Sequence, residues 1–180
     1  MSFMKKLIYR LRGEYTTEQL INRGMRVGTN FLRLNGVILD PDHCWHITIG
    51  DDVTLAPRVH VLCHDASTKH YLNYTKIGNV KIGNRVFVGA ESVILPGVMI
   101  GDDVIIGANS TITHDIPSNS VAVGSPARII GTTEDYIKKE CTRMESSLCF
   151  GAEYTLRQNV SMEKRQEIRE QIDGKIGYID

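Results

Sequence analysis

The chain has 180 residues, a length that suits one domain of ordinary size with short additions. Its 21 Lys and Arg residues balance 21 Asp and Glu residues, so it lacks the basic excess of a nucleic-acid-binding protein and any single-sign charge that would attract acidic substrates. Its four cysteines form no CxxC pair, and we expect reduced thiols in a cytoplasmic protein.

The N-terminal segment predicts a short helical cap. Residues 1–12 begin like a signal peptide, with Lys5 and Lys6, but Arg10 and Arg12 interrupt the apolar run. No stretch of the sequence is long enough to span a membrane, so we expect no membrane insertion. Thr16 offers an N-cap and Gly24 a C-cap for one short helix. We assign residues 1–26 to a cap over the repeats that follow.

Short aliphatic stretches then recur along the chain. Val27 and residues 37–39 indicate irregular early coils, and a six-residue spacing first appears at Ile49, Leu55 and Val61. The six-residue spacing is then lost over residues 64–76, which are mainly polar and aromatic. A repeat protein carries such an insertion on one face as a loop, and that face is often the binding face.

The stretch from Ile82 to Pro117 repeats every six residues. Each step places a β-branched aliphatic residue in the same position, and these are Ile82, Val88, Ile94, Ile100, Ile106 and Ile112. A six-residue step provides one short strand and one turn, because two inward positions lie two residues apart and a small residue follows them. Three steps close a triangular coil of about 18 residues, and stacked coils pair their strands.

The composition changes after the repeat ends. Thr132 starts one predicted helix, residues 161–172 form another, and Gly174 stops the second. We therefore divide the chain after the cap into a repeat region, residues 27–130, with an inserted loop at 65–76, and a helical extension, residues 131–180.

The six-residue pattern resembles the hexapeptide-repeat acyltransferase family. The resemblance implies a mainly β fold, namely a left-handed parallel β-helix. Its left hand comes from the resemblance alone, because strand crossovers in general favour the right hand. The resemblance also implies a homotrimer in which each active site lies between two neighbouring prisms.

The residues around His64 resemble the segment that carries the family's catalytic histidine. Galactoside and maltose O-acetyltransferases hold that histidine two residues further along from the same Ala-Pro, and commonly have Asn where Arg58 stands. The pattern HCW…APRVH…HDAST, which begins here at His43, is closer to the capsule- and exopolysaccharide-associated O-acetyltransferases. The resemblance implies that His64 is the general base of direct transfer from acetyl-CoA, without an acyl-enzyme.

Cys63 offers a rival mechanism, with a thiolate nucleophile and a covalent intermediate. The alternation from inward Val59 and Val61 turns Cys63 toward the interior. We therefore interpret Cys63 as a buried structural residue.

The resemblance places coenzyme A along the coil corners. Matched by position, the implied contacts are Gly89, Ala90, Ala108, Thr113, His114 and Arg128. Backbone N–H groups near Gly89 and Ala90 are the expected oxyanion donors. Arg128 ends a stretch that looks like the family's terminal G-[NV]-P-[AC]-[RK] signature. His114 replaces the usual Lys, so one phosphate contact is expected to be weaker or pH-dependent.

The expected function is an acetyl-CoA-dependent O-acetyltransferase acting on a saccharide or similar small hydroxyl compound, with an amine acceptor as the alternative. Arg58, Asp65 and Tyr74 are the expected acceptor contacts, and Trp45 and Tyr71 or Tyr74 are aromatic side chains suited to stacking on a sugar ring. No metal is expected.

Two other functions use the same coil. A zinc enzyme like γ-carbonic anhydrase needs three converging histidines, and His60, His64 and His70 are the available set. A non-enzymatic scaffold is the second alternative, since a fold does not establish an activity. Neither alternative function explains why the chain has the terminal signature that ends at Arg128.

Overall fold

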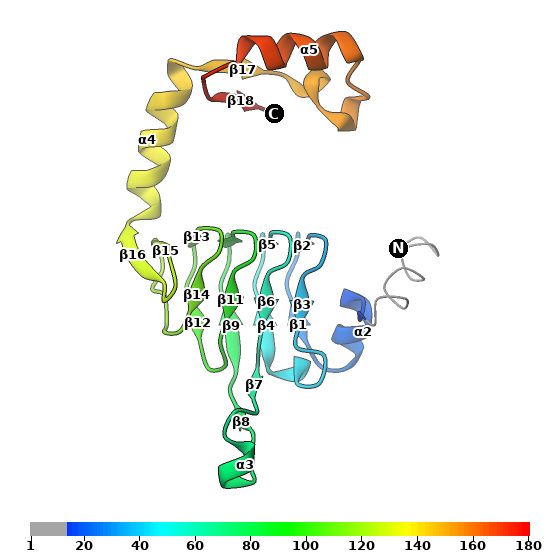
Figure 1. Ribbon diagram of the computed structural model, residues 1–180, viewed down its shortest axis with the longest axis vertical. Coiled ribbons are helices and arrows are strands. Elements are labelled where there is room, and N and C mark those ends of the chain that lie inside the picture. Colours follow the sequence, from blue (N-terminus) through cyan, green and yellow to red (C-terminus); the bar gives the residue numbers. More distant parts are fainter. Residues whose placement is uncertain (1–13) are drawn as a thin grey trace. The chain divides into compact units, whose positions relative to one another are not determined.

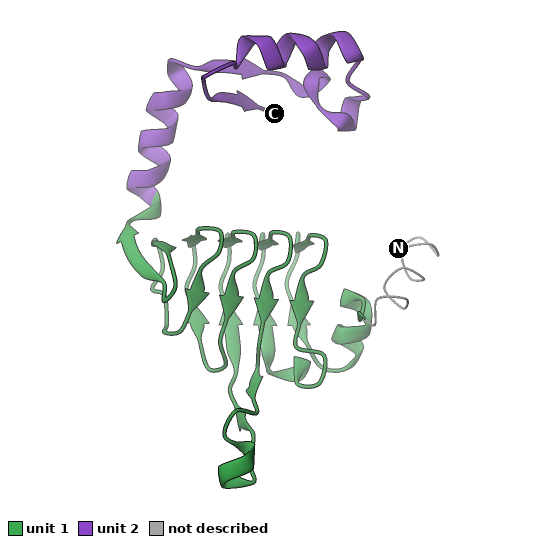
Figure 2. Cartoon of the chain, in the orientation of Figure 1, with its two compact units in different colours: residues 1–133 green, residues 134–180 purple. Residues whose placement is uncertain are grey.

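The computed structural model describes residues 14–180, which form two compact units, one ending at Thr133 and the other spanning Glu134–Asp180 (Figure 2). The segment considered above as a signal peptide and the first half of the predicted cap lie outside the described residues. Within residues 14–180, no helix combines the length and the apolar character needed to cross a membrane.

Unit 1 is built from three sheets of short parallel strands, each contributed by successive coils (Figure 1). Sheet I consists of β1 (Arg26–Val27), β4 (Ile47–Ile49), β9 (Val80–Ile82) and β12 (Met99–Ile100). Sheet II consists of β2 (Leu32–Arg33), β5 (Thr54–Leu55), β10 (Phe87–Val88), β13 (Ile105–Ile106), β15 (Val121–Val123) and, antiparallel at its edge, β16 (Arg128–Gly131). Sheet III consists of β3 (Ile38–Leu39), β6 (His60–Val61), β11 (Val93–Ile94) and β14 (Thr111–Ile112).

The hexapeptide positions form the interior of this prism. The six β-branched residues predicted to point inward are at most 3% exposed. Val93 pairs with Thr111, the equivalent position one full coil later, so three six-residue steps close a coil as predicted. Two inward serines replace aliphatic residues in the core, and the hydroxyls of Ser92 and Ser110 donate to the carbonyl oxygen of Gly107 at 3.1 and 2.7 Å. The mainly β architecture is therefore confirmed.

Two coils are longer than the regular ones, and both carry their extra residues at the same corner. In sheet III, Ile38 pairs with His60, and His60 pairs with Val93. In both pairs the residues are further apart in sequence than the regular pair Val93 and Thr111 of β11 and β14. The extra residues lie within the connecting segments 40–46, between β3 and β4, and 62–79, between β6 and β9. Both segments connect sheet III to sheet I. We call this edge of the prism the III–I corner.

The second insertion is an arm rather than an irregular loop (Figure 1). Its strands β7 (His64–Asp65) and β8 (Lys76–Ile77) pair antiparallel, and α3 (Lys69–Leu72) lies between them. The first insertion contains a short 3-10 turn, η1 (Cys44–His46). The elements of both insertions are too short and too polar to give a periodic signal. The sequence therefore indicates where the repeat breaks but does not predict the hairpin of the arm.

A helix covers the first coil, as the sequence predicts. In α2 (Thr17–Asn22) the Thr16 hydroxyl accepts from Gln19 N–H and the Gln19 side chain accepts from Thr16 N–H, which forms a capping box. Leu20 is fully buried and belongs to the same hydrophobic core as the inward residues of the coils. The helix thus closes the open end of the apolar interior.

Unit 2 contains both predicted C-terminal helices. They are α4 (Thr133–Glu145), which starts at the last residue of unit 1, and α5 (Met162–Gln171), where the Ser161 hydroxyl accepts from Lys164 N–H at 3.3 Å. The sequence did not predict its two parallel strands, β17 (Leu148–Phe150) and β18 (Gly177–Ile179), because strands this short do not show alternation. Two 3-10 turns, η2 (Ala152–Tyr154) and η3 (Leu156–Gln158), lie between β17 and α5.

Close stacking of the coils makes Gly83→Ala destabilising. A Cβ at Gly83 would lie 2.7 Å from the carbonyl carbon and oxygen of Gly101 in the next coil, where backbone leaves no room. We expect a loss of about 2 kcal/mol of unfolding free energy, or about 4–8 °C in Tm by thermal denaturation. Gly131→Ala is the matched control, because its Cβ would meet nothing within 4 Å. Equal Tm values for the two variants would contradict this.

Candidate active site

His64 and Asp40 meet at the III–I corner, each contributed by one of the two insertions. Asp40 follows β3, and His64 begins the arm one coil later. The Nδ1 atom of His64 lies 2.5 Å from Oδ2 of Asp40. The Asp40 side chain is fully buried, whereas 33% of the His64 side chain is exposed. The pair therefore has an anchored carboxylate and an imidazole that reaches the surface.

Asp40 is held by backbone donors on both oxygens. Its Oδ2 also accepts from Cys63 N–H at 2.8 Å, and its Oδ1 accepts from the N–H groups of Asp42 and His43 at 3.3 and 3.2 Å. Burial raises the pKa of the Asp40 carboxyl, but these donors together with His64 outweigh it and lower the pKa below its ordinary value. Asp40 is consequently ionised at neutral pH.

An ionised Asp40 fixes the tautomer of His64. A carboxylate with no proton can only accept, so Nδ1 of His64 carries the hydrogen that it donates to Asp40. The lone pair of the neutral ring is then on Nε2, the nitrogen away from Asp40. This arrangement makes His64 a base whose orientation is set by its partner.

Sequence reasoning missed Asp40 as the partner of His64, and the adjacent Asp65, expected above as an acceptor contact, is not that partner. Asp65 instead accepts from Ser67 N–H at 2.9 Å, which is the main reason that its pKa is lowered. The signal for Asp40 was its place directly after the aliphatic pair of β3. That signal is usable only once the pairing of Ile38 with His60, across a coil of irregular length, is known.

Aromatic rings from the first insertion continue the surface beside His64. The ring centroid of His43 lies 4.6 Å from that of His64 and 5.5 Å from that of Trp45. Trp45 is half exposed. Nδ1 of His46 lies 2.7 Å from the side-chain oxygen of Asn79, which ties the first insertion to the base of the arm.

Cys63 does not have the properties of a nucleophile. It is fully buried, as predicted, and burial together with the nearby Asp40 carboxylate raises the pKa of its thiol to about 12. Cys63 is therefore a thiol at neutral pH and does not supply a thiolate nucleophile.

The six residues expected to contact coenzyme A divide between two corners of unit 1. Gly89, Ala90 and Ala108 lie in turns between sheets II and III, at the II–III corner, where a Cβ on Gly89 would clash with the backbone of Ala108. Thr113 and His114 follow β14 at the III–I corner, with Thr113 Oγ1 2.8 Å from His114 Nδ1.

Arg128, the sixth expected contact, is an exposed residue that begins β16. Next to it, Ala127 N–H donates to the Thr111 carbonyl at the start of β14. Arg128 therefore lies at the sheet II edge beside the last coil, on the side of the II–III corner.

The three expected acceptor contacts are not gathered around His64. Arg58 lies at the II–III corner and pairs with Glu91, and Tyr74 is 78% exposed on the arm. Asp65 shares β7 with His64 but is bonded to Ser67. The side chains that contact His64 instead include those of Asp40 and His43, from the first insertion.

Within the described part of the chain, one group of three metal-ligating side chains is present, Asp40, His43 and His64, whose ligand atoms lie within 4.8 Å of one another. The set expected for a zinc hydratase is not assembled in this way, since neither His60 nor His70 joins His64.

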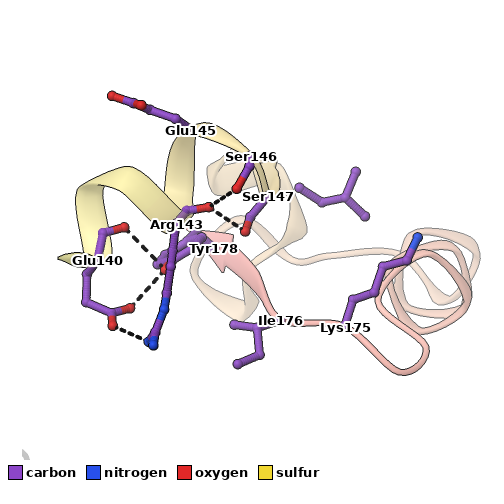
Figure 3. A pocket seen from close by; sticks show the side chains of 9 residues that line it. Glu140, Arg143, Glu145, Ser146, Ser147, Lys175, Ile176 and Tyr178 are labelled. Atoms are coloured by element: carbon purple, nitrogen blue, oxygen red, sulfur yellow. Dashed lines mark hydrogen bonds and ion pairs between the residues drawn. The ribbon is translucent and has the colours of Figure 1, made fainter.

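Unit 2 contains a pocket of about 720 Å³ (Figure 3). Two of its charged side chains pair with each other, since Arg143 Nη1 lies 2.6 Å from Glu140 Oε1, and the Tyr178 hydroxyl donates to Glu140 Oε2 at 2.9 Å. Glu145 and Lys175 also line the pocket. No candidate site residue from the sequence lies in it. The histidine, the buried carboxylate and the exposed rings make the III–I corner the better candidate site.

Comparison with known proteins supports the six-residue repeat that builds the coil. Residues 79–114 match the family model described as bacterial transferase hexapeptide (six repeats). The chain is 40% identical over 117 residues to galactoside O-acetyltransferase of Escherichia coli K12, covering 62% of this chain and 55% of that protein. It therefore spans about half the length of that relative.

Two further matches cover more of both proteins. Protein CapG of Staphylococcus aureus is 33% identical over 168 residues, which cover 89% of this chain and 92% of CapG. A galactoside acetyltransferase solved in complex with coenzyme A superposes with a TM-score of 0.56 at 31% identity, over 74% of this chain and 80% of that one. The repeat, the coil that it builds and these relatives together place the chain in the hexapeptide-repeat acyltransferase family.

Proposed function

We propose that this protein is an acetyl-CoA-dependent O-acetyltransferase that acetylates a hydroxyl of a saccharide or a similar small acceptor. The observation that carries the proposal is His64, whose partly exposed ring lies at the III–I corner with its Nδ1 fixed by the buried Asp40 carboxylate. Direct acyl transfer needs one oriented base, and this pair provides it without a covalent nucleophile.

In the proposed mechanism, His64 Nε2 accepts the proton of the acceptor hydroxyl as its oxygen attacks the thioester carbonyl carbon of acetyl-CoA. Asp40 stabilises the imidazolium that forms. The same Nε2 then gives its proton to the departing sulfur, so coenzyme A leaves as a thiol and His64 returns to its neutral form. Gly89 N–H already donates to the Ile106 carbonyl at 2.8 Å, so we assign the oxyanion to Ala90 N–H in the same turn.

We infer that the working unit is a homotrimer of left-handed coils, as the family resemblance implies. His64 and Ala90 lie at opposite ends of the sheet III strands, so a second chain is the simple way to bring such corners together. The outer face of sheet II supports association, because Leu32 and Phe87, on either side of β5 in the same register, are 51% and 45% exposed.

A sugar is the acceptor that we favour. The half-exposed Trp45 indole is two rings away from His64, through His43, which suits a pyranose ring stacked on the indole. Two relatives are named for a galactoside and for lipopolysaccharide biosynthesis, the latter 36% identical over 96 residues.

The test is release of free coenzyme A thiol from acetyl-CoA with a panel of saccharides, matched amino sugars and simple amines. Transfer to hydroxyl sugars at a rate well above hydrolysis is expected. Preferential transfer to the amines would replace the O-acetyltransferase assignment by N-acetylation. Zinc-dependent hydration of carbon dioxide without acyl transfer would instead favour the γ-carbonic-anhydrase alternative.

Arg128→Ala is expected to raise KM for acetyl-CoA about tenfold with little change in kcat, since a lost charge-assisted contact to a phosphate is worth about 1.4 kcal/mol. The guanidinium is exposed and its Nη1 donates to the neighbouring Ala127 carbonyl. Steady-state kinetics with acetyl-CoA and with its analogue lacking the 3′-phosphate check this. Lys81→Ala, at an exposed cation on sheet I, is the control. An unchanged KM in Arg128→Ala would remove Arg128 from the binding site.

A further inference from the structure

We propose that Asp40, His43 and His64 form a Zn²⁺ site whose occupation switches off the base of the proposed acetyl transfer. The inference therefore rests on the proposed function for its inhibitory effect, although not for the binding of the ion. The site lies at the III–I corner, and its three residues come from both insertions.

The donor atoms are close to the spacing that zinc requires. Nδ1 of His64 is 2.5 Å from Asp40 Oδ2, and Nδ1 of His43 is 3.8 Å from Asp40 Oδ1. If each of the three residues offers one ligand atom, these three atoms lie within 4.8 Å of one another. Tetrahedral zinc with bonds of about 2.0–2.2 Å needs donor atoms roughly 3.3 Å apart, so small side-chain rotations bring them into place.

His43 supplies an independent observation. Its Nδ1 is buried and has no hydrogen-bond partner within residues 14–180, although Asp40 Oδ1 lies only 3.8 Å away. A buried nitrogen without a partner is unfavourable, and native proteins rarely leave one. A metal ion bound between His43 and Asp40 would satisfy this nitrogen.

The set has the composition of a zinc site rather than of a calcium or magnesium site. Two imidazoles and one carboxylate suit zinc, whereas calcium and magnesium prefer oxygen donors. Three protein ligands leave a fourth position for water. The buried Asp40 carboxylate gives the ion a fixed negative partner.

Zinc binding changes which nitrogen of His64 carries the proton. In the metal-free ring, Nδ1 carries the hydrogen and Nε2 has the lone pair. When Nδ1 donates its lone pair to Zn²⁺, its proton moves through solvent to Nε2, and the ring stays neutral. Nε2–H cannot accept the proton of an acceptor hydroxyl, so acetyl transfer stops until the ion leaves.

The binding test uses the full chain after dialysis against a chelator. Zn²⁺ affinity is measured by competition with a chromophoric chelator, and Co²⁺ substitution reports tetrahedral geometry by its visible absorption. We expect one ion per chain and at least about tenfold weaker binding in His43→Phe, which keeps a ring beside His64 but removes both nitrogens. His43→Gln is the second variant if the first does not fold.

His46→Gln is the matched control. Its ring centroid lies 6.4 Å from that of His43, and its Nδ1 is engaged by Asn79, so the variant should bind zinc like the native protein. Equal affinity for zinc in His43→Phe and native protein, or more than one weakly bound ion per chain, would overturn the site and leave an adventitious ion only.

The activity test adds Zn²⁺ at saturating acetyl-CoA and acceptor. A fall in kcat that a chelator reverses, and that His43→Phe escapes, is expected. Stimulation by zinc, or binding without loss of activity, would overturn the switch. If no acceptor is acetylated at all, the proposed function fails, while the binding measurements still decide whether the zinc site exists.

Discussion

His64→Ala is expected to lower kcat for acetyl transfer about 10³-fold, with KM for acetyl-CoA changed little. General-base catalysis by a positioned side chain contributes roughly 10²–10⁴-fold. Within the described residues, no other imidazole lies within hydrogen-bond distance of Asp40, since His43 Nδ1 is 3.8 Å away. The loss should lie in kcat because proton transfer occurs only as the acceptor attacks. Steady-state and single-turnover kinetics measure it.

The control for this variant is His60→Gln. His60 lies earlier on the same coil, in β6, is partly exposed, and makes no contact with Asp40 or His64 in the described residues. It should retain near-native kcat. If His64→Ala also kept its activity while native Tm was preserved, the assignment of the base would be wrong.

Asp40→Asn is expected to lower kcat about 10²-fold and to destabilise the III–I corner. Each Asp40 oxygen accepts two hydrogen bonds. Oδ2 accepts from Cys63 N–H and His64, and Oδ1 accepts from two backbone N–H groups. An amide has one oxygen and one NH₂, so in either orientation its NH₂ faces donors. The hydrogen bond that selects the His64 tautomer is then lost or reversed.

Asp40 also predicts a pH dependence of stability. Because its pKa is lower in the folded protein than in the unfolded chain, its ionised form stabilises the fold above the unfolded pKa, near 3.9. This contribution is lost as the pH falls through the lower, folded pKa. Native protein should therefore lose stability in acid more steeply than Asp40→Asn, as measured by urea denaturation between neutral pH and pH 3.

Asp42→Asn is the matched control, since its side chain is exposed and its backbone N–H is the group that contacts Asp40. It should keep native kcat and the native pH profile. A purely structural Asp40 would lower Tm in Asp40→Asn without lowering kcat in the protein that remains folded. Such a result would remove Asp40 from its positioning role.

The location of the site follows from the stacking of the coils. Insertions at equivalent places in consecutive coils must project from the same corner, because each coil repeats the path of the one before. Residues 40–46 and the arm belong to consecutive coils, and Asp40 and His64 are bonded across them. Two short insertions on a rigid prism thus provide a buried anion, an oriented base and an aromatic surface.

The sequence by itself determined the coil, its inward residues and the place where it is interrupted. A period of six residues with a β-branched residue at each step has few other solutions, and Ile94, Ile106 and Ile112 are fully buried as that period requires. It also predicted α2, α4 and α5 through their caps, and the burial of Cys63 through alternation along one strand. All of these features depend on neighbours close in the chain.

Only the tertiary structure decided which carboxylate holds His64. Asp65 is adjacent in sequence, but successive side chains on a strand point to opposite sides, and it bonds to Ser67. Asp40 is distant in sequence and reaches His64 because the coil brings the two insertions together. Contacts between coils depend on the length of every intervening turn, which periodicity does not give where the repeat is irregular.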